Sequence, residues 1–197
     1  MDKLSYAWGL AMGKQLQAMG VKELNSESFK DGVKVAFDGG TPEMPLEEAQ
    51  KLINEYLEDL AKKAEAAARE AGEKFLAENK MKENVQSTAS GLQYVVEKEG
   101  EGAQPTAEDE VTVHYTGKLL DGTVFDSSVN RGEPATFPLN RVIPGWTEGV
   151  QLMKEGAKYT FFIPSDLAYG AQGVPQVIPP HSTLIFEVEL IKVNKKA

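Results

Sequence analysis

The apolar positions of this chain follow two different periods, and the period changes near residue 87. In the first half, apolar side chains recur at three- and four-residue steps, which is the spacing of one face of an α-helix. In the second half they alternate with polar side chains, which is the spacing of a half-buried β-strand. The pattern therefore predicts two domains, a helical part over residues 1–86 and a part built mainly on strands over residues 87–197.

The first half begins with two expected helices. The first has an apolar face over residues 4–19 and ends near Gly20, because glycine readily takes the left-handed backbone that ends many helices. The second begins at Asn25 or Ser26, since either side chain can accept a hydrogen bond from the first turn. We expect it to end at Gly39 for the same reason as the first.

A third expected helix is unusually long. It begins at Pro45 and continues to about Glu83, which is about 38 residues, or about 55 Å at 1.5 Å per residue. Beyond Ala61 its apolar stripe fades to alanines among charged residues, a composition with high helix propensity and little to bury. Such a segment either packs weakly on its own domain or forms an exposed spacer arm, and we favour the spacer arm.

The three helices provide little core by themselves, because so short a helical segment buries only a modest apolar area. Segments of this kind usually oligomerise, and a two-fold dimer is the commonest arrangement. We therefore expect a homodimer formed through residues 1–60. The bulky apolar side chains available for such a surface are Trp8, Met12, Phe29, Phe37, Leu52 and Tyr56.

The second half is expected to form an antiparallel sheet. Asp121 and Gly122 lie between two apolar runs, which is a strong hairpin signal. One short helix is indicated over residues 145–153, with Gly156 after it. The fold class is therefore α+β: a helical module with a long connecting helix, then a curved antiparallel sheet around one short helix. The alternating strand positions are Leu92, Tyr94 and Val96, then Val111, Val113 and Tyr115, and finally Leu184, Phe186, Val188 and Leu190.

The charge of the chain argues against nucleic acid as a partner. The formal net charge is −9, with 41% hydrophobic and 26% charged residues, as in an ordinary globular protein. Residues 1–86 carry 12 basic and 16 acidic side chains, and residues 87–197 carry 9 and 14. Neither part has the basic stripe that phosphate neutralisation requires, so we expect no nucleic-acid partner.

The residues that usually bind metals are scarce. The chain contains no cysteine and only two histidines, His114 and His181. This composition excludes disulfides, thiol nucleophiles and thiolate metal sites. We therefore expect neither a metal nor a cofactor.

Compartment signals are weak. No apolar run approaches the ~20 residues that a membrane span needs, so no membrane span is expected. The first residues lack the apolar core of a signal peptide, which predicts a cytoplasmic protein. The alternative is a periplasmic or cell-surface protein whose signal peptide is missing from this sequence.

Five short segments of the second half occur in one order within about eighty residues. Together they closely resemble the FK506-binding (FKBP) family of peptidyl-prolyl cis-trans isomerases (EC 5.2.1.8). The resemblance covers residues 90–193, about half of the chain, and implies the same curved sheet around one short helix. The five segments are residues 111–128, 142–146, 167–170, 177–181 and 183–190.

The resemblance also implies a ligand pocket. Phe125, Asp126 and Tyr169 match the residues at which catalysis takes place in the family. Asp126 would lie at the rim and orient the substrate, while Tyr169 and the backbone N–H of Ile143 would donate hydrogen bonds to a substrate carbonyl. Trp146 would form the floor. The implied substrate- and inhibitor-binding set is Tyr115, Phe125, Asp126, Arg131, Val142, Ile143, Trp146, Tyr169, Ile178 and Phe186.

Each of these residues also has a simpler interpretation. An aromatic side chain on a strand is far more often part of the core than of a site, and Asp126 could be an ordinary turn residue. Arg131 is either the ion-pair partner of Asp126 or a solvated surface arginine. Ser127 and Ser128 have no general base beside them in the sequence, so a nucleophilic serine is not expected.

Two positions depart from the family pattern. Ala135 stands where many members have a large aromatic side chain, and Val174 stands where a histidine is frequent. Both departures concern the rim of the implied pocket. They are expected to change substrate preference and inhibitor affinity and to leave the core activity intact.

The whole chain is similar to the Mip-type dimeric FKBPs of bacteria. That resemblance implies a prolyl isomerase and chaperone for unfolded or partly folded proline-containing proteins, and binding of FK506- or rapamycin-like macrolides. The alternatives are a non-catalytic FKBP-like binding module and a holdase chaperone whose function lies in the helical half.

Overall fold

The computed structural model describes residues 2–196, and their contacts form two compact units that divide between residues 64 and 65. This division lies within the third helix, upstream of the boundary that the change of period predicts at 86/87. The boundary at 64/65 separates two regions that each have many internal contacts. The predicted boundary at 86/87 instead separates fragments that are expected to fold independently. The division into 1–86 and 87–197 therefore stays a prediction.

The N-terminal unit consists of helices, as predicted. It contains α1 (Lys3–Ala18), α2 (Ser26–Asp38) and the first part of α3 (Leu46–Asn79). The side chain of Asn25 accepts a 2.9 Å hydrogen bond from the backbone N–H of Ser28, so Asn25 is the N-cap of α2. The third helix is 34 residues long, close to the expected length.

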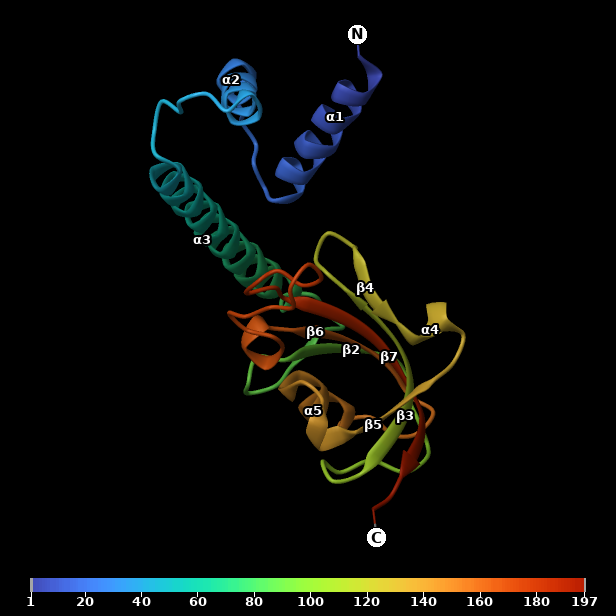
Figure 1. Ribbon diagram of the computed structural model, residues 1–197. Helices are drawn as coiled ribbons and strands as arrows, with labels where there is room; N and C mark the ends of the chain where they lie inside the picture. Colours follow the sequence, from blue (N-terminus) through green and yellow to red (C-terminus); the bar gives the residue numbers. More distant parts are fainter. Residues whose placement is uncertain (1, 197) are drawn as a thin grey trace. The chain divides into compact units, whose positions relative to one another are not determined.

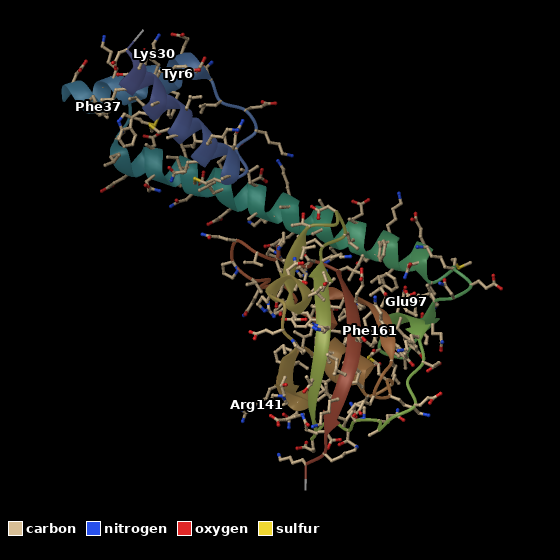
Figure 2. The ribbon with its side chains drawn as sticks, turned by 90° about the vertical axis from the view of Figure 1, so that its right-hand side faces the viewer. Tyr6, Lys30, Phe37, Glu97, Arg141 and Phe161 are labelled. Carbon is tan, nitrogen blue, oxygen red and sulfur yellow. The ribbon has the colours of Figure 1, made fainter. Side chains whose placement is uncertain are left out.

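None of residues 2–64 is buried. Trp8 is 66% exposed, and Phe37, which is labelled in Figure 2, is 89% exposed. A folded protein rarely exposes several large apolar side chains to this extent on one surface. The helices of this unit thus leave their apolar faces uncovered within one chain.

The C-terminal unit is built on an antiparallel sheet with the strand order β1-β2-β6-β7-β3-β4, and β5 pairs with β3 (Figure 1). This arrangement confirms the predicted α+β class. The strands are β1 (Gln86–Ser87), β2 (Gln93–Lys98), β3 (Glu110–Lys118), β4 (Val124–Ser127), β5 (Ala135–Pro138), β6 (Lys158–Ile163) and β7 (Leu184–Asn194).

The sheet curves around the short helix α5 (Pro144–Val150), as Figure 1 shows. Pro144 occupies the first turn, where its missing N–H costs no hydrogen bond. Gly149 lets the helix approach β6 closely, because a Cβ built there would lie 2.6 Å from the Phe161 ring. Trp146 and Val150 are buried between the helix and the sheet, so α5 fixes the inner wall of the unit.

The second half of α3 is not an exposed arm. Its residues 65–79 belong to the C-terminal unit, and Figure 2 shows this part of the helix running alongside the strands. Gly72 and Asn79 are buried, and the Phe75 and Phe162 rings lie 5.7 Å apart. The expectation of an exposed spacer therefore differs from the structure over this stretch, because these side chains share one face of the helix.

Candidate active site

A cavity of about 440 Å³ opens beside α5 on the concave side of the sheet. Six elements contribute to it: β3, β4, β5, the 3-10 turn Leu139–Arg141, α5 and β7. Most of its wall is aromatic or aliphatic, and its polar groups lie on a few side chains. The lining residues are Tyr115, Phe125, Asp126, Phe137, Arg141, Val142, Ile143, Trp146, Tyr169 and Phe186.

Trp146 lies at the centre of the aromatic cluster, and only 4% of its surface is exposed. Its ring makes edge-to-face contacts with Tyr115 at 5.2 Å, Phe186 at 5.3 Å and Phe137 at 5.9 Å. Aromatic pairs prefer this geometry, which holds the indole in one orientation. The structure thus places Trp146 where a pocket floor is expected.

Phe125 forms a second wall, and a glycine makes room for it. The Phe125 ring meets the Phe186 ring edge to face at 5.5 Å. A Cβ built on Gly117 would lie 2.6 Å from the Phe125 ring and 2.7 Å from the Phe186 ring. Gly117 on β3 is therefore needed for both rings to meet, and any larger residue would displace them.

Asp126 is held by two partners at the rim of the cavity. The Tyr115 hydroxyl donates a 2.5 Å hydrogen bond to Asp126 Oδ2, and the Arg131 guanidinium forms an ion pair with Asp126 Oδ1. Arg131 also donates a 2.9 Å hydrogen bond to the Tyr115 hydroxyl. The structure therefore places Arg131 as the partner of Asp126 and not as an unpaired surface side chain.

The pKa shifts keep these groups in fixed protonation states. Burial alone would raise the pKa of Asp126, but the hydrogen bonds from Tyr115 and Arg131 outweigh it and hold that pKa below its usual value. Burial raises the pKa of Tyr115, and burial together with the charge of Asp126 raises the pKa of Tyr169. At neutral pH the site thus presents one carboxylate and two protonated phenols, an arrangement suited to orienting a ligand.

Tyr169 and Ile143 both line the cavity. Tyr169 is 39% exposed at the rim, just after the 3-10 turn Ser165–Leu167. The Ile143 carbonyl accepts hydrogen bonds from Trp146 at 2.9 Å and Thr147 at 3.1 Å, which begins α5. Their predicted roles as donors to a substrate carbonyl stay predictions.

Two lining residues were missed by reasoning from the sequence. Phe137 lies two positions after Ala135 on β5, so both point to the same side of the strand, and the Phe137 and Tyr115 rings lie 6.0 Å apart in a tilted arrangement. Phe137 supplies an aromatic wall next to Ala135, whose side chain is small. The alternation of side chains along a strand could have identified Phe137. Arg141, labelled in Figure 2, lies at the rim, and no pattern in the sequence identified it.

Ile178 is buried in the core and lines a groove next to the cavity, together with Leu119, residue 172 and residues 174–180. Its predicted role in binding substrate stays a prediction. Val174, the second departure from the family pattern, pairs with Ile178 in an isolated bridge of the same loop. Both residues therefore support the loop next to the cavity.

His114 and Ser128 form a pair outside the cavity. His114 points away from the pocket, as alternation predicts, and its Nδ1 lies 3.0 Å from Ser128 Oγ. Ser128 is fully buried and its Oγ accepts a 2.8 Å hydrogen bond from the backbone N–H of Tyr115. A hydroxyl with no access to substrate cannot act as a nucleophile, so this pair fixes the strand that carries Tyr115.

The described residues 2–196 contain no cluster of three or more His, Cys, Asp or Glu side chains able to hold a metal ion. Within the same residues, no helix is both long enough and apolar enough to cross a membrane.

Comparisons with known proteins identify both halves. Residues 101–191 match the model of the FKBP-type peptidyl-prolyl cis-trans isomerases, and residues 1–96 match the domain amino-terminal to them. The probable FKBP-type isomerase FkpA of Neisseria meningitidis is 48% identical over 98% of this chain and 75% of that protein. The chain belongs to the FKBP-type peptidyl-prolyl cis-trans isomerase family.

Relatives with the same two-part organisation extend this finding. The FKBP-type 22 kDa isomerase of Escherichia coli is 47% identical over 96% of this chain and 93% of its own length. The crystal structure of FkpA from Escherichia coli matches with a TM-score of 0.81 and 35% identity, covering 98% of this chain and 95% of that chain. The FKBP and Mip-like resemblance and the predicted fold class are thus confirmed.

One relative bears on the compartment. A protein of Legionella longbeachae, 40% identical over the full length of this chain and 87% of its own, is named outer membrane protein MIP. The expectation of a cytoplasmic location gains no support from that name.

Proposed function

We propose that this FKBP-type protein catalyses rotation about X–Pro peptide bonds in folding proteins. One observation carries the proposal beyond family membership: an ionised Asp126, held by Tyr115 and Arg131, lies at the rim of an aromatic cavity floored by Trp146. A proline ring is apolar and compact enough for such a cavity. The carboxylate at the rim then determines how the peptide enters.

The reaction needs neither a proton transfer nor a nucleophile. Rotation about an X–Pro bond has a barrier of about 18–20 kcal/mol, which comes from amide resonance. Resonance places partial charge on the amide oxygen and nitrogen, and the twisted transition state loses that separation. An apolar cavity that excludes water therefore favours the twisted form over the planar form.

Specific donors add to this effect if they bind the carbonyl more tightly during twisting. The Tyr169 phenol stays protonated because its pKa is raised, so it can donate to a substrate oxygen. The Ile143 backbone N–H is the second proposed donor. Val142 and Phe186 would hold the proline ring against Trp146, all three being lining residues of the cavity.

We also propose that the same cavity binds FK506- or rapamycin-like macrolides, because these present a proline-like ring. Phe137 gives the cavity an aromatic wall despite Ala135. The loop that carries Val174 and Ile178 would contact the outer part of a macrolide.

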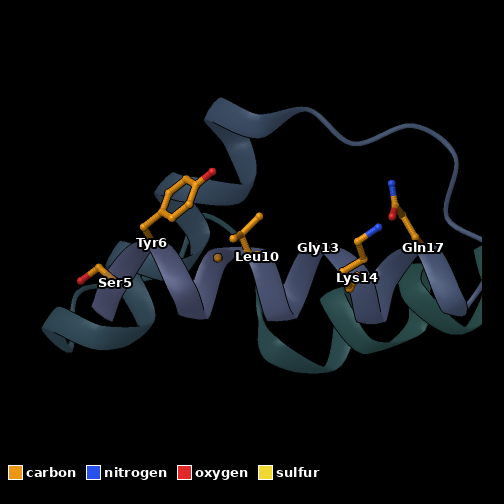
Figure 3. Close-up of a pocket in the computed structure, with 7 residues that line it drawn as sticks. Ser5, Tyr6, Leu10, Gly13, Lys14 and Gln17 are labelled. Carbon is orange, nitrogen blue, oxygen red and sulfur yellow. The ribbon is translucent and has the colours of Figure 1, made fainter. Parts of the chain in front are cut away.

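The helical half is proposed to form a homodimer through residues 1–60. Its large apolar side chains are exposed in a single chain, so a second copy is the occupant that would cover them. A groove of about 530 Å³ runs along α1, and Figure 3 draws the side chains that line it. A Cβ at Gly9 or Gly13 would meet nothing within 4 Å, which leaves room for another helix to approach closely. The groove is lined by Ser5, Tyr6, Gly9, Leu10, Gly13, Lys14 and Gln17.

Dimerisation would support a chaperone activity. Two linked sites raise the effective concentration for a long unfolded client that reaches both, whereas a short peptide gains nothing. Two other functions stay open as alternatives, a non-catalytic binding module and a holdase. A proline tetrapeptide assay separates the isomerase from the binding module, and refolding with full-length and truncated protein tests the holdase.

A periplasmic or cell-surface location is proposed, because the name of the Legionella relative favours it. Fractionation of cells that express the native gene tests it, and recovery of the protein in the cytoplasmic fraction would contradict it.

The deciding experiment for the isomerase is a coupled assay on an apolar-X–Pro tetrapeptide. Folded wild-type protein is expected to accelerate the cis-to-trans step. No acceleration at high site concentration would overturn the proposed activity and leave the binding module as the better interpretation.

A further inference from the structure

The second half of α3 is fastened to the back of the isomerase unit by a defined row of contacts. Four residues at helical spacing share the buried face, namely Gly72, Phe75, Leu76 and Asn79. The Asn79 amide donates a 3.0 Å hydrogen bond to the buried side chain of Gln93, and the Gln93 amide donates a 2.8 Å bond to the Leu76 carbonyl. These buried bonds set the position of the helix along β2.

At Gly72, α3 closely approaches the chain that enters β7. A Cβ built on Gly72 would lie 2.5 Å from Thr183 Oγ1 and 3.4 Å from Thr183 Cβ. Thr183 is itself buried and directly precedes Leu184, the first residue of β7. The same strand carries Phe186 in the pocket wall. A side chain at position 72 would thus push on a segment that leads straight into the site.

A second contact lies one helical turn earlier. The Arg69 guanidinium nitrogen Nη2 lies 3.2 Å from Nδ1 and 3.4 Å from Nε2 of His181. The backbone of His181 has a φ of 58°, the left-handed region that residues other than glycine rarely adopt. Its N–H donates a 2.8 Å hydrogen bond to the carbonyl of Gly170. Gly170 follows Tyr169, so the contacts run from the helix to the proposed donor.

We propose that Arg69, Gly72 and His181 are positioning residues for the proposed isomerase reaction, acting on Tyr169 through the loop that ends at Thr183. Tyr169 lies on the rim and its backbone carbonyl accepts a 3.1 Å hydrogen bond from Gly173. The position of Tyr169 therefore depends on the conformation of the loop that ends at Thr183, and α3 contacts the end of this loop at His181 and Thr183. The inference rests on the proposed isomerase function, since it names what places one of its donors.

The first test adds a methyl group at position 72, where it would collide with Thr183. Gly72→Ala is expected to lower kcat/KM on a proline tetrapeptide about threefold or more, because small displacements of a donor weaken transition-state contacts. Thr183→Ala removes the atom that the methyl group would meet, so the double variant is expected to recover the rate of Thr183→Ala alone. Equal rates for wild type and Gly72→Ala would overturn the inference.

A matched control separates the contact from helix propensity. Gly32 lies within α2, and a Cβ there would meet nothing within 4 Å. Gly32→Ala gives the same intrinsic gain in helix stability as Gly72→Ala. It is expected to leave the tetrapeptide rate unchanged. A loss equal to that of Gly72→Ala would overturn the assignment to Thr183.

The second test asks whether the effect passes through Tyr169. In a Tyr169→Phe background the hydroxyl is gone, so Gly72→Ala is expected to have little further effect on kcat/KM, as coupled residues are non-additive. His181→Gly keeps the left-handed backbone and removes the imidazole, and it is expected to lower the rate in the Tyr169 protein only. An undiminished loss in the Tyr169→Phe background would overturn the inference and indicate a general effect on folding.

The NMR amide resonance of Gly170 distinguishes the proposed isomerase function from the proposed positioning role of the α3 contacts. The amide resonance of Gly170 is expected to shift in Gly72→Ala and to return in the variant that also carries Thr183→Ala. An inactive wild type that shows these shifts would overturn the proposed isomerase function and support the contact. An active wild type whose Gly170 resonance does not respond would overturn the positioning inference alone.

Discussion

The two units of this chain differ in where their large apolar side chains lie. In the C-terminal unit, Phe161, Leu184 and Val188 are fully buried in one core. In the N-terminal unit, Trp8 and Phe37 are mostly exposed, and none of residues 2–64 is buried. Both parts have regular helices with capping residues, so the difference is in packing and not in local structure.

This difference teaches that regular secondary structure alone does not show which part of a chain folds by itself. The stability of a helix in a protein comes mostly from the apolar face that it packs. The C-terminal unit packs its faces within one chain, whereas α1 and α2 leave theirs exposed. We propose that a second copy covers them. Stability of the N-terminal unit should therefore depend on protein concentration, and that of the C-terminal unit should not.

The largest expected effect comes from separating the units. Residues 65–197 should fold as a monomer and keep most activity on short peptides, while residues 1–64 should lose their helical signal on dilution.

The full chain should run as a dimer and should accelerate proline-limited refolding of a protein much more than the fragment of residues 65–197 does, at equal site concentration. Light scattering and both assays on both proteins measure this. A monomeric full chain would contradict the dimer.

Removing the carboxylate of the site should give the next largest effect. Asp126→Ala is expected to lower kcat/KM at least about tenfold, equivalent to ~1.4 kcal/mol of transition-state stabilisation. The physical reason is the loss of the group that Tyr115 and Arg131 hold at the rim. Circular dichroism provides the folding control. Wild-type rates in the folded variant would remove Asp126 from the proposed mechanism.

The α3 contacts make a prediction about where the C-terminal fragment must begin. A fragment of residues 87–197 lacks Asn79 and Phe75, so the Gln93 side chain loses its buried hydrogen bond and the Phe162 ring is exposed to water. It should melt about 5–10 °C below a fragment of residues 65–197, since about 1 kcal/mol corresponds to 4–8 °C in a small domain. Thermal unfolding of both measures this. Equal melting temperatures would favour the boundary at 86/87.

Macrolide binding should be measurable but weaker than in relatives with an aromatic residue at the position of Ala135. A macrolide ring over Trp146 should change the tryptophan fluorescence and inhibit the tetrapeptide assay. Ala135→Phe should strengthen binding by a few-fold, because it adds apolar contact at the rim. Unchanged fluorescence and activity at saturating macrolide would contradict binding at this cavity.

The smallest effect concerns acid stability at the C-terminus. Hydrogen bonds from Thr106, Lys195 and Lys196 hold the pKa of Asp109 well below its usual value. A lowered folded-state pKa stabilises the protein above the unfolded pKa of about 4, and that contribution disappears as the pH falls through the folded-state value. Asp109→Asn should therefore be less stable than wild type at about pH 6, with the difference shrinking toward pH 2. Denaturant unfolding across this range measures it, and a constant difference would contradict the assignment.

The sequence predicted most of the fold because its signals are local. Asn25 caps a helix, and alternation along residues 111–118 requires a half-buried strand. The aromatic residues of the cavity were also predicted, through a resemblance that depends on motifs close together in the chain. The structure brings Tyr115, Asp126 and Trp146 to one cavity, as that resemblance implies.

What was missed depends on contacts between distant residues. The buried face of α3 has helical spacing at Gly72, Phe75, Leu76 and Asn79, but a glycine and an asparagine do not register as an apolar stripe. Arg141 reaches the rim only because of how its turn precedes α5. The groove next to the cavity, which Ile178 and Val174 line, likewise depends on how residues 172–180 fold back, and no periodic pattern in the sequence predicts that.

The close approach of the Phe125 and Phe186 rings to Gly117 limits which substitutions could make this pocket resistant to an inhibitor. Substitution there would separate the rings of Phe125 and Phe186, on which the wall depends, so a resistant variant at that position would lose its own function. An exposed rim position such as Arg141 carries no such constraint. Resistance to a pocket-filling drug should therefore emerge around the mouth, and a compound confined to the inner aromatic surface would leave few escape routes.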